Sequence, residues 1–367
     1  MKEKKVDKFL LITFFLLLIV GLFMFFSSSL GILARKESAF YAVIISQLAL
    51  GLPLGLLGFY FALKVNFKFW KKYSFYIFLG SILLTLAVFI PFLGVDHQGA
   101  RRWIDIGPVS FQPVEFLKFG FIIYFSAWLS WAKTRAKDFR FGILPFFIML
   151  AVIALVLFNQ PDTKSFILIF VTGVGMLFLS EVPFKYIFIT GLVGLVTLAS
   201  LVMYVPYLQS RVKTFIDPAN DPRGSGYQIQ QSMIAIGSGG LFGRGYGQSV
   251  QKFNYLPEPQ GDSIFAIIGE ELGFIGASGV VLLYLLFAMR GMKVAKLAPD
   301  SFGRLLAGGI VIMITAQSFL NIASITGVFP LTGVPLVFMS HGGTSLMIYM
   351  VAVGIVLNIS KFQKKNI

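Results

Sequence analysis

Few side chains in this sequence can do chemistry, and most of those lie beside or within long apolar runs. The 367 residues include 16 aspartates and glutamates, two histidines and no cysteine. Disulfides, cysteine-ligated metals and a histidine-rich metal site are therefore excluded. The candidates are three acids and three cations: Glu115, Asp162, Asp262, Arg101, Arg102 and Lys118. A carboxylate can take a proton from a hydroxyl, and the planar fork of arginine suits a phosphate group.

The acids at the ends of apolar runs also have a structural interpretation. Asp162 and Asp262 each stand just before such a run, where aspartate is a favoured helix N-cap. Capping and catalysis therefore both stay open for these two residues. Glu270 and Glu271 are consecutive, so on a helix they point about 100° apart. At most one of them can face a given cavity, and a structural role is expected for both.

Glu115 and Lys118 are ionisable residues inside an apolar run. Their spacing of three places them on one helix face. They can form an ion pair that only neutralises itself, because burying a paired charge costs less than burying a lone one. Alternatively they line a polar cavity, since ionisable residues within a span usually mark a functional site. Arg101 and Arg102 can likewise bind a phosphate or anchor a loop at the membrane surface.

The apolar runs predict the elements that must position these residues. Hydrophobic residues make up 57% of the chain and charged residues 13%, about half the charged share of a soluble domain. Runs of about 20 apolar residues can cross a bilayer, and such runs occur at 9–30, 39–63, 72–93, 112–131, 141–158, 163–180, 185–205, 263–289, 305–328 and 338–360. The prediction is an all-α membrane protein, a polytopic bundle of about ten transmembrane helices forming a single domain over residues 1–367.

Lysine and arginine predict the orientation of this bundle. If the N-terminus is inside, the inside segments carry roughly twice as many lysines and arginines as the outside segments. An excess of these residues marks cytoplasmic loops, so both termini are expected in the cytoplasm. The net charge of +15 then follows the membrane topology and does not indicate a nucleic-acid partner.

One connection is much longer than the others and falls on the outside. It spans residues 206–262, and its apolar residues predict short helices lying on the membrane, with an amphipathic helix at 226–236. Six glycines at 237–247 then break this helix. They do not form a dinucleotide-binding motif, because that motif needs a preceding strand within a βαβ unit. A second outer loop, residues 94–111, is rich in polar side chains.

The residue types and apolar runs alone therefore predict a helical bundle with an outward-facing polar site. Two classes of protein fit this description, an enzyme that acts on a lipid-phosphate substrate and a transporter. Transporters often show paired interrupted helices in two related halves, and no internal repeat of that kind is found in the sequence.

Five groups of residues resemble the SEDS family (shape, elongation, division and sporulation), which includes FtsW, RodA and SpoVE. They are GARRWIDIG at 99–107 with FQPVEFLK at 111–118; NQPD at 159–162; DPRGSGYQ at 221–228 with QSMIAIGSGGLFG at 231–243; YLPEP at 255–259 with DSIFA at 262–266 and EELG at 270–273; and LTGVP at 331–335 with SHGG at 340–343. The resemblance covers nearly the whole chain and keeps the same order.

The resemblance implies a polymerase at the outer face of the bacterial cytoplasmic membrane. Its substrate would be lipid II, the undecaprenyl-pyrophosphate-linked disaccharide-pentapeptide, and its product glycan strands. The family's essential loop acid corresponds to Asp262, expected to be the catalytic general base, and its membrane acid–lysine pair corresponds to Glu115 and Lys118. These two, with Arg101, Arg102 and Asp162, are expected to bind the substrate. No cofactor is implied with certainty; a divalent cation could assist, but no ligand set for it is evident.

The resemblance also implies partners and a branch of the family. A class B penicillin-binding protein would crosslink the strands. Residues 247–252 and the ending at 358–360 look more like FtsW than RodA, which favours cell division and other divisome proteins as partners. A RodA-like elongation polymerase and a lipid II flippase are the alternatives.

The sequence departs from the family pattern at several places. Gly261 and Ser263 flank the loop acid where Thr and Phe are usual, and Val114 replaces a serine. Thr163 and Lys164 replace Leu-Gly after NQPD, and His341 replaces a tyrosine. None of these changes removes a charged group, so they bear on the substrate groove and on the branch of the family.

Overall fold

The ten predicted spans are all helical in the computed structural model, which describes residues 5–97, 100–106, 109–222 and 224–363. They correspond to α1 (Lys8–Leu33), α2 (Glu37–Ile44) continuing through a π-helical turn into α3 (Leu52–Lys64), α5 (Ser74–Leu86), α6 (Pro113–Ala132), α7 (Phe139–Gly142) with α8 (Leu144–Asn159), α9 (Thr163–Leu179), α10 (Phe184–Tyr204), α13 (Ile264–Lys296), α14 (Ser301–Ile325) and α15 (Gly343–Ser360). Gly99, Gly107 and Arg223, which belong to the motifs above, lie outside the described residues.

The lengths of these helices support a multi-pass membrane protein. Within the described residues, seven helices or helix runs are long and apolar enough to cross a membrane. Ser74–Phe89 and Thr163–Leu179 are apolar but shorter. The remaining predicted span, α6, has 20 residues and carries the charged pair Glu115 and Lys118. The prediction of a polytopic helical bundle is therefore confirmed, and its number of spans stays at about ten.

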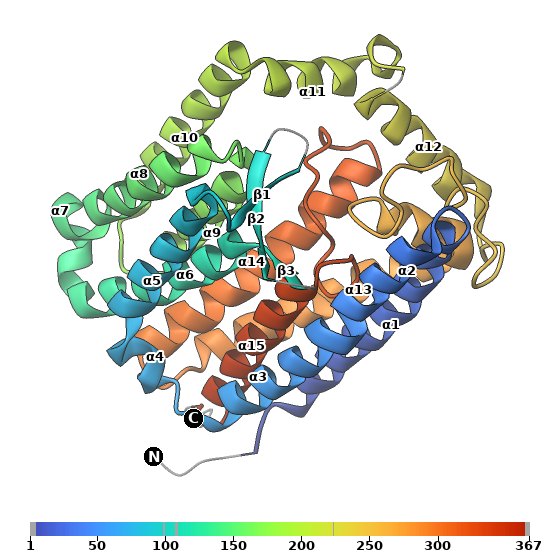
Figure 1. The fold of residues 1–367 in the computed structure, drawn as a ribbon. Helices are drawn as coiled ribbons and strands as arrows, with labels where there is room; N and C mark the ends of the chain where they lie inside the picture. The colour runs from blue at the N-terminus through green and yellow to red at the C-terminus, as the bar shows by residue number, and fades with distance from the viewer. Residues whose placement is uncertain (1–4, 98–99, 107–108, 223, 364–367) are drawn as a thin grey trace.

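Two helices form the centre of the bundle. α14 packs against α13, α9, α6 and α15, and α15 packs against α3. Figure 1 shows α14 and α15 enclosed by the other helices, whereas α10 lies at the periphery. In α10 only Ile187 and Thr190 are buried. A lipid-facing helix needs no buried stripe, because its apolar side chains are as well solvated by lipid as by protein.

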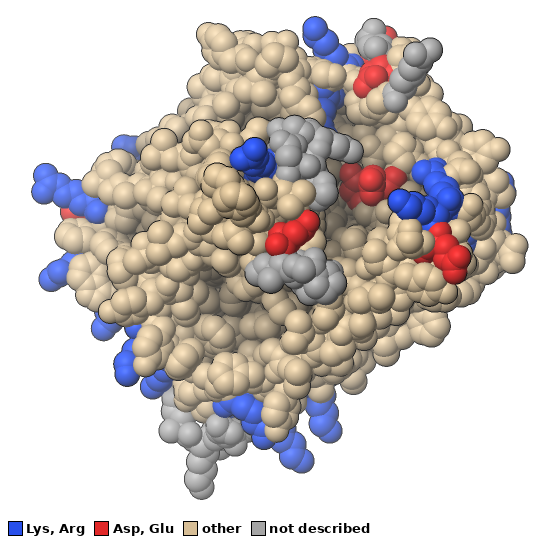
Figure 2. Space-filling view, in the orientation of Figure 1, with Lys and Arg blue, Asp and Glu red and all other residues tan. Residues whose placement is uncertain are grey.

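The start of α1 and the end of α15 lie at the same end of the molecule (Figure 1). The backbone N–H of Asp7 donates to Ser360 Oγ at 3.0 Å, and Arg290, near the end of α13, forms an ion pair with Asp7 at 2.8 Å. Basic side chains gather along the left and lower edges of Figure 2, where Figure 1 places α4 (Lys68–Lys72), α7 and the end of α15. Two termini on one side require an even number of spans.

The opposite end carries a small sheet that the sequence did not predict. The polar loop at 94–111 folds into three antiparallel strands, β1 (Gly94–His97), β2 (Ala100–Ile106) and β3 (Val109–Phe111), in the order β1-β2-β3. Ile104, in the middle of β2, is only 2% exposed. Its burial fixes which face of β2 meets the bundle, since side chains alternate along a strand.

The long loop at 206–262 contains two α-helices, α11 (Pro206–Ile216) and α12 (Ser225–Ser238), with a short 3-10 helix at Pro218–Asn220 between them. The predicted amphipathic helix at 226–236 is confirmed by α12. In Figure 1 α10, α11 and α12 form an arch over this end of the bundle. The arch places the long loop beside the small sheet and the start of α13.

The glycine-rich turn after α12 docks against a break in α13. Gly273 has φ +67°, and a Cβ there would lie 2.2 Å from the amide nitrogen of Gly243, so only glycine fits. The N–H groups of Phe274 and Ile275 donate to the carbonyls of Gly240 and Leu241 at 2.8 and 3.2 Å. The turn thereby satisfies backbone groups that the break in the helix leaves without helical partners.

Candidate active site

Asp262 stands in the loop immediately before α13, and its carboxylate faces other polar side chains. Its Oδ1 accepts a hydrogen bond from Gln228 Nε2 at 3.0 Å, and Gln228 also donates to Ser263 Oγ at 2.9 Å. Gln228 comes from α12, so the long loop supplies this contact. The carboxylate accepts no backbone N–H from the first turn of α13 within the described residues. Asp262 therefore does not act as a helix cap.

The backbone around Asp262 is held by side chains from α14 and from the segment before α15. Asn321 Nδ2 donates to the Asp262 carbonyl at 2.7 Å and to the Val334 carbonyl at 2.8 Å. Ser340 Oγ donates to the Gly261 carbonyl at 2.7 Å. These contacts involve main-chain oxygens, so they position the carboxylate without engaging it.

Cations from three different elements line a cavity together with this carboxylate. Lys164, at the start of α9, and Arg211, on α11, both attract it electrostatically. Arg102 lines the same two cavities as Asp262, and its Nε donates to the Gln160 carbonyl at 3.0 Å. Neighbouring side chains of a strand point to opposite faces, and Arg102 shares the buried face with Ile104, whereas Arg101 is exposed. Arg102 lines the cavities at Asp262 and Arg101 does not, so contact of Arg101 with substrate stays a prediction.

Two cavities meet at Asp262. The larger has a volume of about 390 Å³, and the smaller about 270 Å³. Arg102, Lys164, Asp262 and Gly333 line both of them. The surface in Figure 2 is hollowed near its centre, beside acidic and basic side chains. A carboxylate and two cations thus stand on the boundary between two spaces that could hold two reacting groups.

The larger cavity combines this polar boundary with an apolar wall. The wall comes from α9, α10, α11, α14 and the following loop, through Ile167, Leu198, Val202, Leu208, Val212, Leu320 and Phe329. The smaller cavity is more polar and includes Glu258 and His341. An amphiphile with an anionic head and an apolar tail matches the larger cavity, because each part meets its own kind of surface.

Burial raises the proton affinity of two acids that line these cavities, Asp262 and Glu258. It raises the pKa of the Asp262 carboxyl above its ordinary value, against the opposing effect of Lys164, Arg211 and the Gln228 hydrogen bond. Burial and the Asp262 charge also raise the pKa of Glu258. A carboxylate with a raised pKa is a stronger base, which suits proton abstraction near neutral pH.

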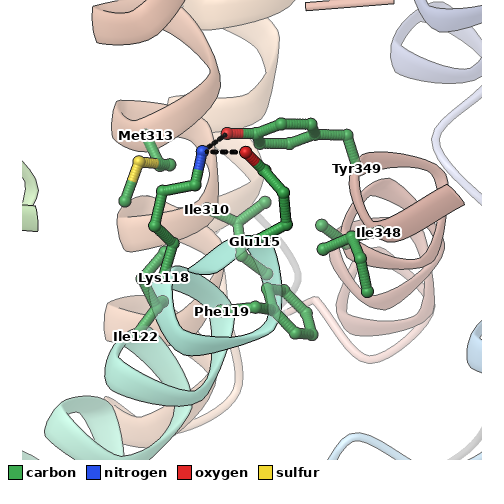
Figure 3. A pocket seen from close by; sticks show the side chains of 9 residues that line it. Glu115, Lys118, Phe119, Ile122, Ile310, Met313, Ile348 and Tyr349 are labelled. Atoms are coloured by element: carbon green, nitrogen blue, oxygen red, sulfur yellow. Dashed lines mark hydrogen bonds and ion pairs between the residues drawn. The ribbon is translucent and has the colours of Figure 1, made fainter. Parts of the chain in front are cut away.

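Glu115 and Lys118 form an ion pair at 2.8 Å, and both are 4% exposed. Lys118 Nζ also donates to Gln317 Oε1 at 3.0 Å and to Tyr349 Oη at 3.1 Å. Figure 3 shows the lysine ammonium between the glutamate and the tyrosine. The pair lines a separate cavity of only about 10 Å³, and neither residue lines the two cavities at Asp262.

The pair nevertheless connects to the site through α14. Gln317 accepts from Lys118 and donates to the Pro335 carbonyl at 3.1 Å. Asn321, one helical turn further along α14, holds Asp262 and Val334. The geometry therefore favours a supporting role for Glu115 and Lys118, and their contact with substrate stays a prediction.

We expect Glu115 and Lys118 to be energetically coupled. Glu115→Gln or Lys118→Met leaves one buried charge without its partner, whereas the double variant removes both charges. A double-mutant cycle on the thermal stability of the detergent-solubilised protein should give a coupling energy of about 0.5–3 kcal/mol. Strictly additive losses would contradict direct pairing in the folded protein.

The remaining predicted acids have structural positions. Asp162 is fully buried and caps α9, accepting from the backbone N–H of Ser165 at 3.3 Å and from its hydroxyl at 2.7 Å. Asp162 does not line either cavity at Asp262, so its contact with substrate also stays a prediction. Glu270 and Glu271 both bind the loop at 247–252. Among the described residues, no three histidine, aspartate or glutamate side chains gather as a metal site.

Comparison with known proteins identifies the family. The protein-family model described as "Cell cycle protein", for FtsW, RodA and SpoVE, matches residues 7–365. The chain belongs to this family. Stage V sporulation protein E of Bacillus subtilis strain 168 is 38% identical over 365 residues, which cover 99% of each chain. A probable peptidoglycan glycosyltransferase FtsW of Geobacter sp. strain M18 is 37% identical over 355 residues, 96% of each chain.

A solved structure supports the same assignment to the FtsW/RodA/SpoVE family. It is the structure of a peptidoglycan synthase complex that coordinates polymerization and crosslinking. The chain superposes on it with a TM-score of 0.79 and 26% sequence identity, covering 98% of this chain and 99% of that one. The predicted membership of the SEDS family is thereby confirmed, together with the membrane-embedded helical fold.

Four polar residues near Asp262 in this family member were not predicted as site residues: Lys164, Arg211, Gln228 and Asn321. Gln228 lies within the DPRGSGYQ stretch, and Lys164 follows NQPD after a single residue, so both stood beside or within family motifs. Arg211 and Asn321 had no such signal. They reach Asp262 only because α11 folds back over the bundle and α14 passes beneath the loop.

Proposed function

We propose that this chain is a peptidoglycan glycosyltransferase that polymerises lipid II into glycan strands, with an FtsW-like role in cell division. The observation that carries the proposal is the Asp262 carboxylate, which lines an apolar-walled cavity together with Arg102, Lys164 and Arg211 and also borders a more polar cavity. The names of several relatives, probable peptidoglycan glycosyltransferases FtsW that are 35–39% identical, agree with it.

The geometry supports a direct displacement at the anomeric carbon of one lipid-linked sugar. Asp262 takes the proton of the acceptor hydroxyl as its oxygen bonds to that carbon. The bond between the carbon and the diphosphate oxygen breaks, and the diphosphate leaves with the electron pair. Proton abstraction of this kind contributes about 10²–10⁴-fold to the rate. Arg102 and Arg211 would stabilise the negative charge on the leaving group, which is often the largest single contribution.

A class B penicillin-binding protein is the proposed partner, because the growing strands must be crosslinked. The solved relative is a complex in which polymerization and crosslinking are coordinated. Many apolar side chains on the outer surfaces of this bundle are exposed, among them Phe188, Leu192 and Leu195 of α10. Such helix surfaces can bind a single-span partner or lipid. Other divisome proteins would join the same assembly.

Polymerisation by the purified pair tests the function. We expect the chain, reconstituted with its class B partner and lipid II, to yield glycan strands that a gel resolves by length. The chain alone should polymerise poorly. Full activity of the isolated chain would show that catalysis does not need the partner, and lipid II movement across a bilayer with no glycan product would instead indicate a flippase.

We further propose that the protein lies in the bacterial cytoplasmic membrane, with both termini in the cytoplasm. The bias of lysine and arginine supports this orientation, and the Asp7–Ser360 contact keeps the two ends on one side. Reporter fusions should therefore place residue 230, within α12, outside the cytoplasm. A cytoplasmic signal at residue 230 would contradict the orientation and put the Asp262 site on the wrong face for a wall polymerase.

A further inference from the structure

Lys164 is a cation at the site that comes from the start of a membrane helix. It is the second residue of α9 and is half-buried. It lines both cavities that meet at Asp262. Its Nζ donates to the Gly333 carbonyl at 2.7 Å. The side chain therefore points at the cavity boundary and is held in place there by a single backbone contact.

The ammonium of Lys164 has unused hydrogen-bonding capacity. A lysine ammonium carries three N–H donors, and in the described part of the chain Gly333 is its one hydrogen-bond acceptor. Asp162 and Asp262 attract it, but no carboxylate of the described residues lies within 4.0 Å of it. The other two cations of the larger cavity also hold backbone carbonyls, Arg102 those of Gln160 and Pro161 and Arg211 that of Leu331.

The balance of charge around Lys164 favours an anion. Arg102, Lys164 and Arg211 bring three positive charges to the larger cavity, and Asp262 is the acid in its lining. The carboxylate of Asp162, the other nearby acid, already binds Ser165. A half-buried cation without a paired counter-charge is costly, and a bound anion would offset that cost. The apolar wall of the same cavity restricts the anion to one that carries an apolar chain.

We propose that Lys164 binds the diphosphate of the polyprenyl-linked donor and stabilises the charge left on it when the sugar departs. The proposal rests on the proposed function and names a substrate contact within it. Two N–H donors of Lys164 are free to bind diphosphate oxygens, and lysine binds phosphate as a compact point charge.

Three variants separate the charge of Lys164 from its contact with Gly333. Lys164→Arg keeps the charge, Lys164→Gln keeps a donor for the Gly333 carbonyl without the charge, and Lys164→Met removes both. The exposed Lys213, also on the outer side, provides the control variant Lys213→Met, because it lines neither cavity. The first measurement is binding of geranylgeranyl diphosphate to the detergent-solubilised protein, compared with geranylgeranyl monophosphate and geranylgeraniol. The second is the KM for lipid II with the partner present.

We expect the Gln and Met variants to bind geranylgeranyl diphosphate about 10- to 100-fold more weakly, the range of a lost charge-assisted hydrogen bond. The Arg variant should stay within about 3-fold of wild type by this argument, and the Lys213 control should not change. Wild type should prefer the diphosphate to the monophosphate and the alcohol, and KM should rise in parallel in the Gln and Met variants.

Other patterns would overturn the proposal. A Gln variant that binds like wild type while the Met variant fails would make Lys164 a clamp for the Gly333 loop. Unchanged binding in all variants, with only the pH profile of the rate displaced, would make it a positioning residue acting through Asp262. If wild type polymerises lipid II and the variants match it, this inference fails and the function stands. If wild type binds the diphosphate through Lys164 but never polymerises, the function fails and this site stands.

Discussion

Replacing Asp262 with asparagine is expected to lower the polymerisation rate by at least about 10²-fold while leaving the protein folded. Asparagine has nearly the same shape, and its amide oxygen can still accept from Gln228. The backbone contacts of Asn321 and Ser340 with this loop do not involve the carboxylate. What is lost is the ability to take a proton, because an amide is not a base near neutral pH.

The assay for Asp262→Asn is glycan synthesis from lipid II with the partner present, alongside the melting temperature and the yield of the complex. Glu37→Gln is the matched control, because Glu37 is an exposed acid at the start of α2. It should retain wild-type activity. Glycan product from the asparagine variant at a near wild-type rate, with the variant folded and bound to its partner, would reject Asp262 as the general base.

The pH profile of the wild-type enzyme provides a second test of Asp262. Burial raises the pKa of this carboxyl, and Lys164, Arg211 and Gln228 oppose the shift without reversing it. The base must be ionised to act, so kcat/KM should fall as pH drops through this raised pKa. The acid limb should therefore lie above the pH at which an ordinary aspartate titrates. An acid limb at or below that pH would contradict a buried general base.

Removing the ammonium of Lys252 is expected to cause the largest loss of stability. Its Nζ pairs with Glu271 Oε1 at 2.7 Å, and both side chains are fully buried. The same ammonium donates to Ser27 Oγ on α1 and to the Gly247 carbonyl. Lys252 thus connects the outer loop, α13 and α1 at one point. Lys252→Met leaves the Glu271 carboxylate buried without its counter-charge, which should cost about 3–5 kcal/mol of unfolding free energy.

Reversible unfolding in mixed micelles would measure the Lys252 effect. Arg244→Gln is the matched control, because Arg244 lies 3.7 Å from the neighbouring Glu270 but its side chain is 41% exposed. Glu270 is buried but keeps hydrogen bonds from Ser249, Val250 and Gln251, so losing this long contact with a solvated arginine should cost only about 0–1 kcal/mol. Adding Glu271→Gln to Lys252→Met should recover part of the loss, since the double variant buries no lone charge. A Lys252→Met variant as stable as the Arg244 control would show that the pair does not hold the loop.

The helical spans were predictable from the sequence because each is a local property. A run of about 20 apolar residues can satisfy its backbone only as a helix within lipid. The run at 9–30 lies within α1, and the run at 305–328 overlaps α14. The amphipathic helix at 226–236 is likewise encoded locally and corresponds to α12. Asp262 was singled out for a related reason, because it lies within a short motif that resembles the family, and its catalytic role stays a prediction.

The sheet at 94–111 and the break at Gly273 were not predictable in the same way. β2 is held against the bundle by the buried Ile104 and by Arg102, whose partner Gln160 lies 58 residues away in the chain. Gly273 is required because the backbone of Gly243 approaches it, and nothing in the sequence near Gly273 indicates that approach. Both features depend on contacts between segments that are distant in sequence.

The sequence by itself determined the class of protein and the ten helical segments, and it singled out Asp262, whose catalytic role stays a prediction. The tertiary structure decided which charged residues share a cavity with that acid. It separated Arg102 from Arg101, placed Glu115 and Lys118 in a buried network beneath the site, and brought in Lys164 and Arg211. The physical reason is the separation in sequence of the contacting residues. A helix forms from hydrogen bonds between residues four apart, whereas a site is assembled by packing between helices that are distant in sequence.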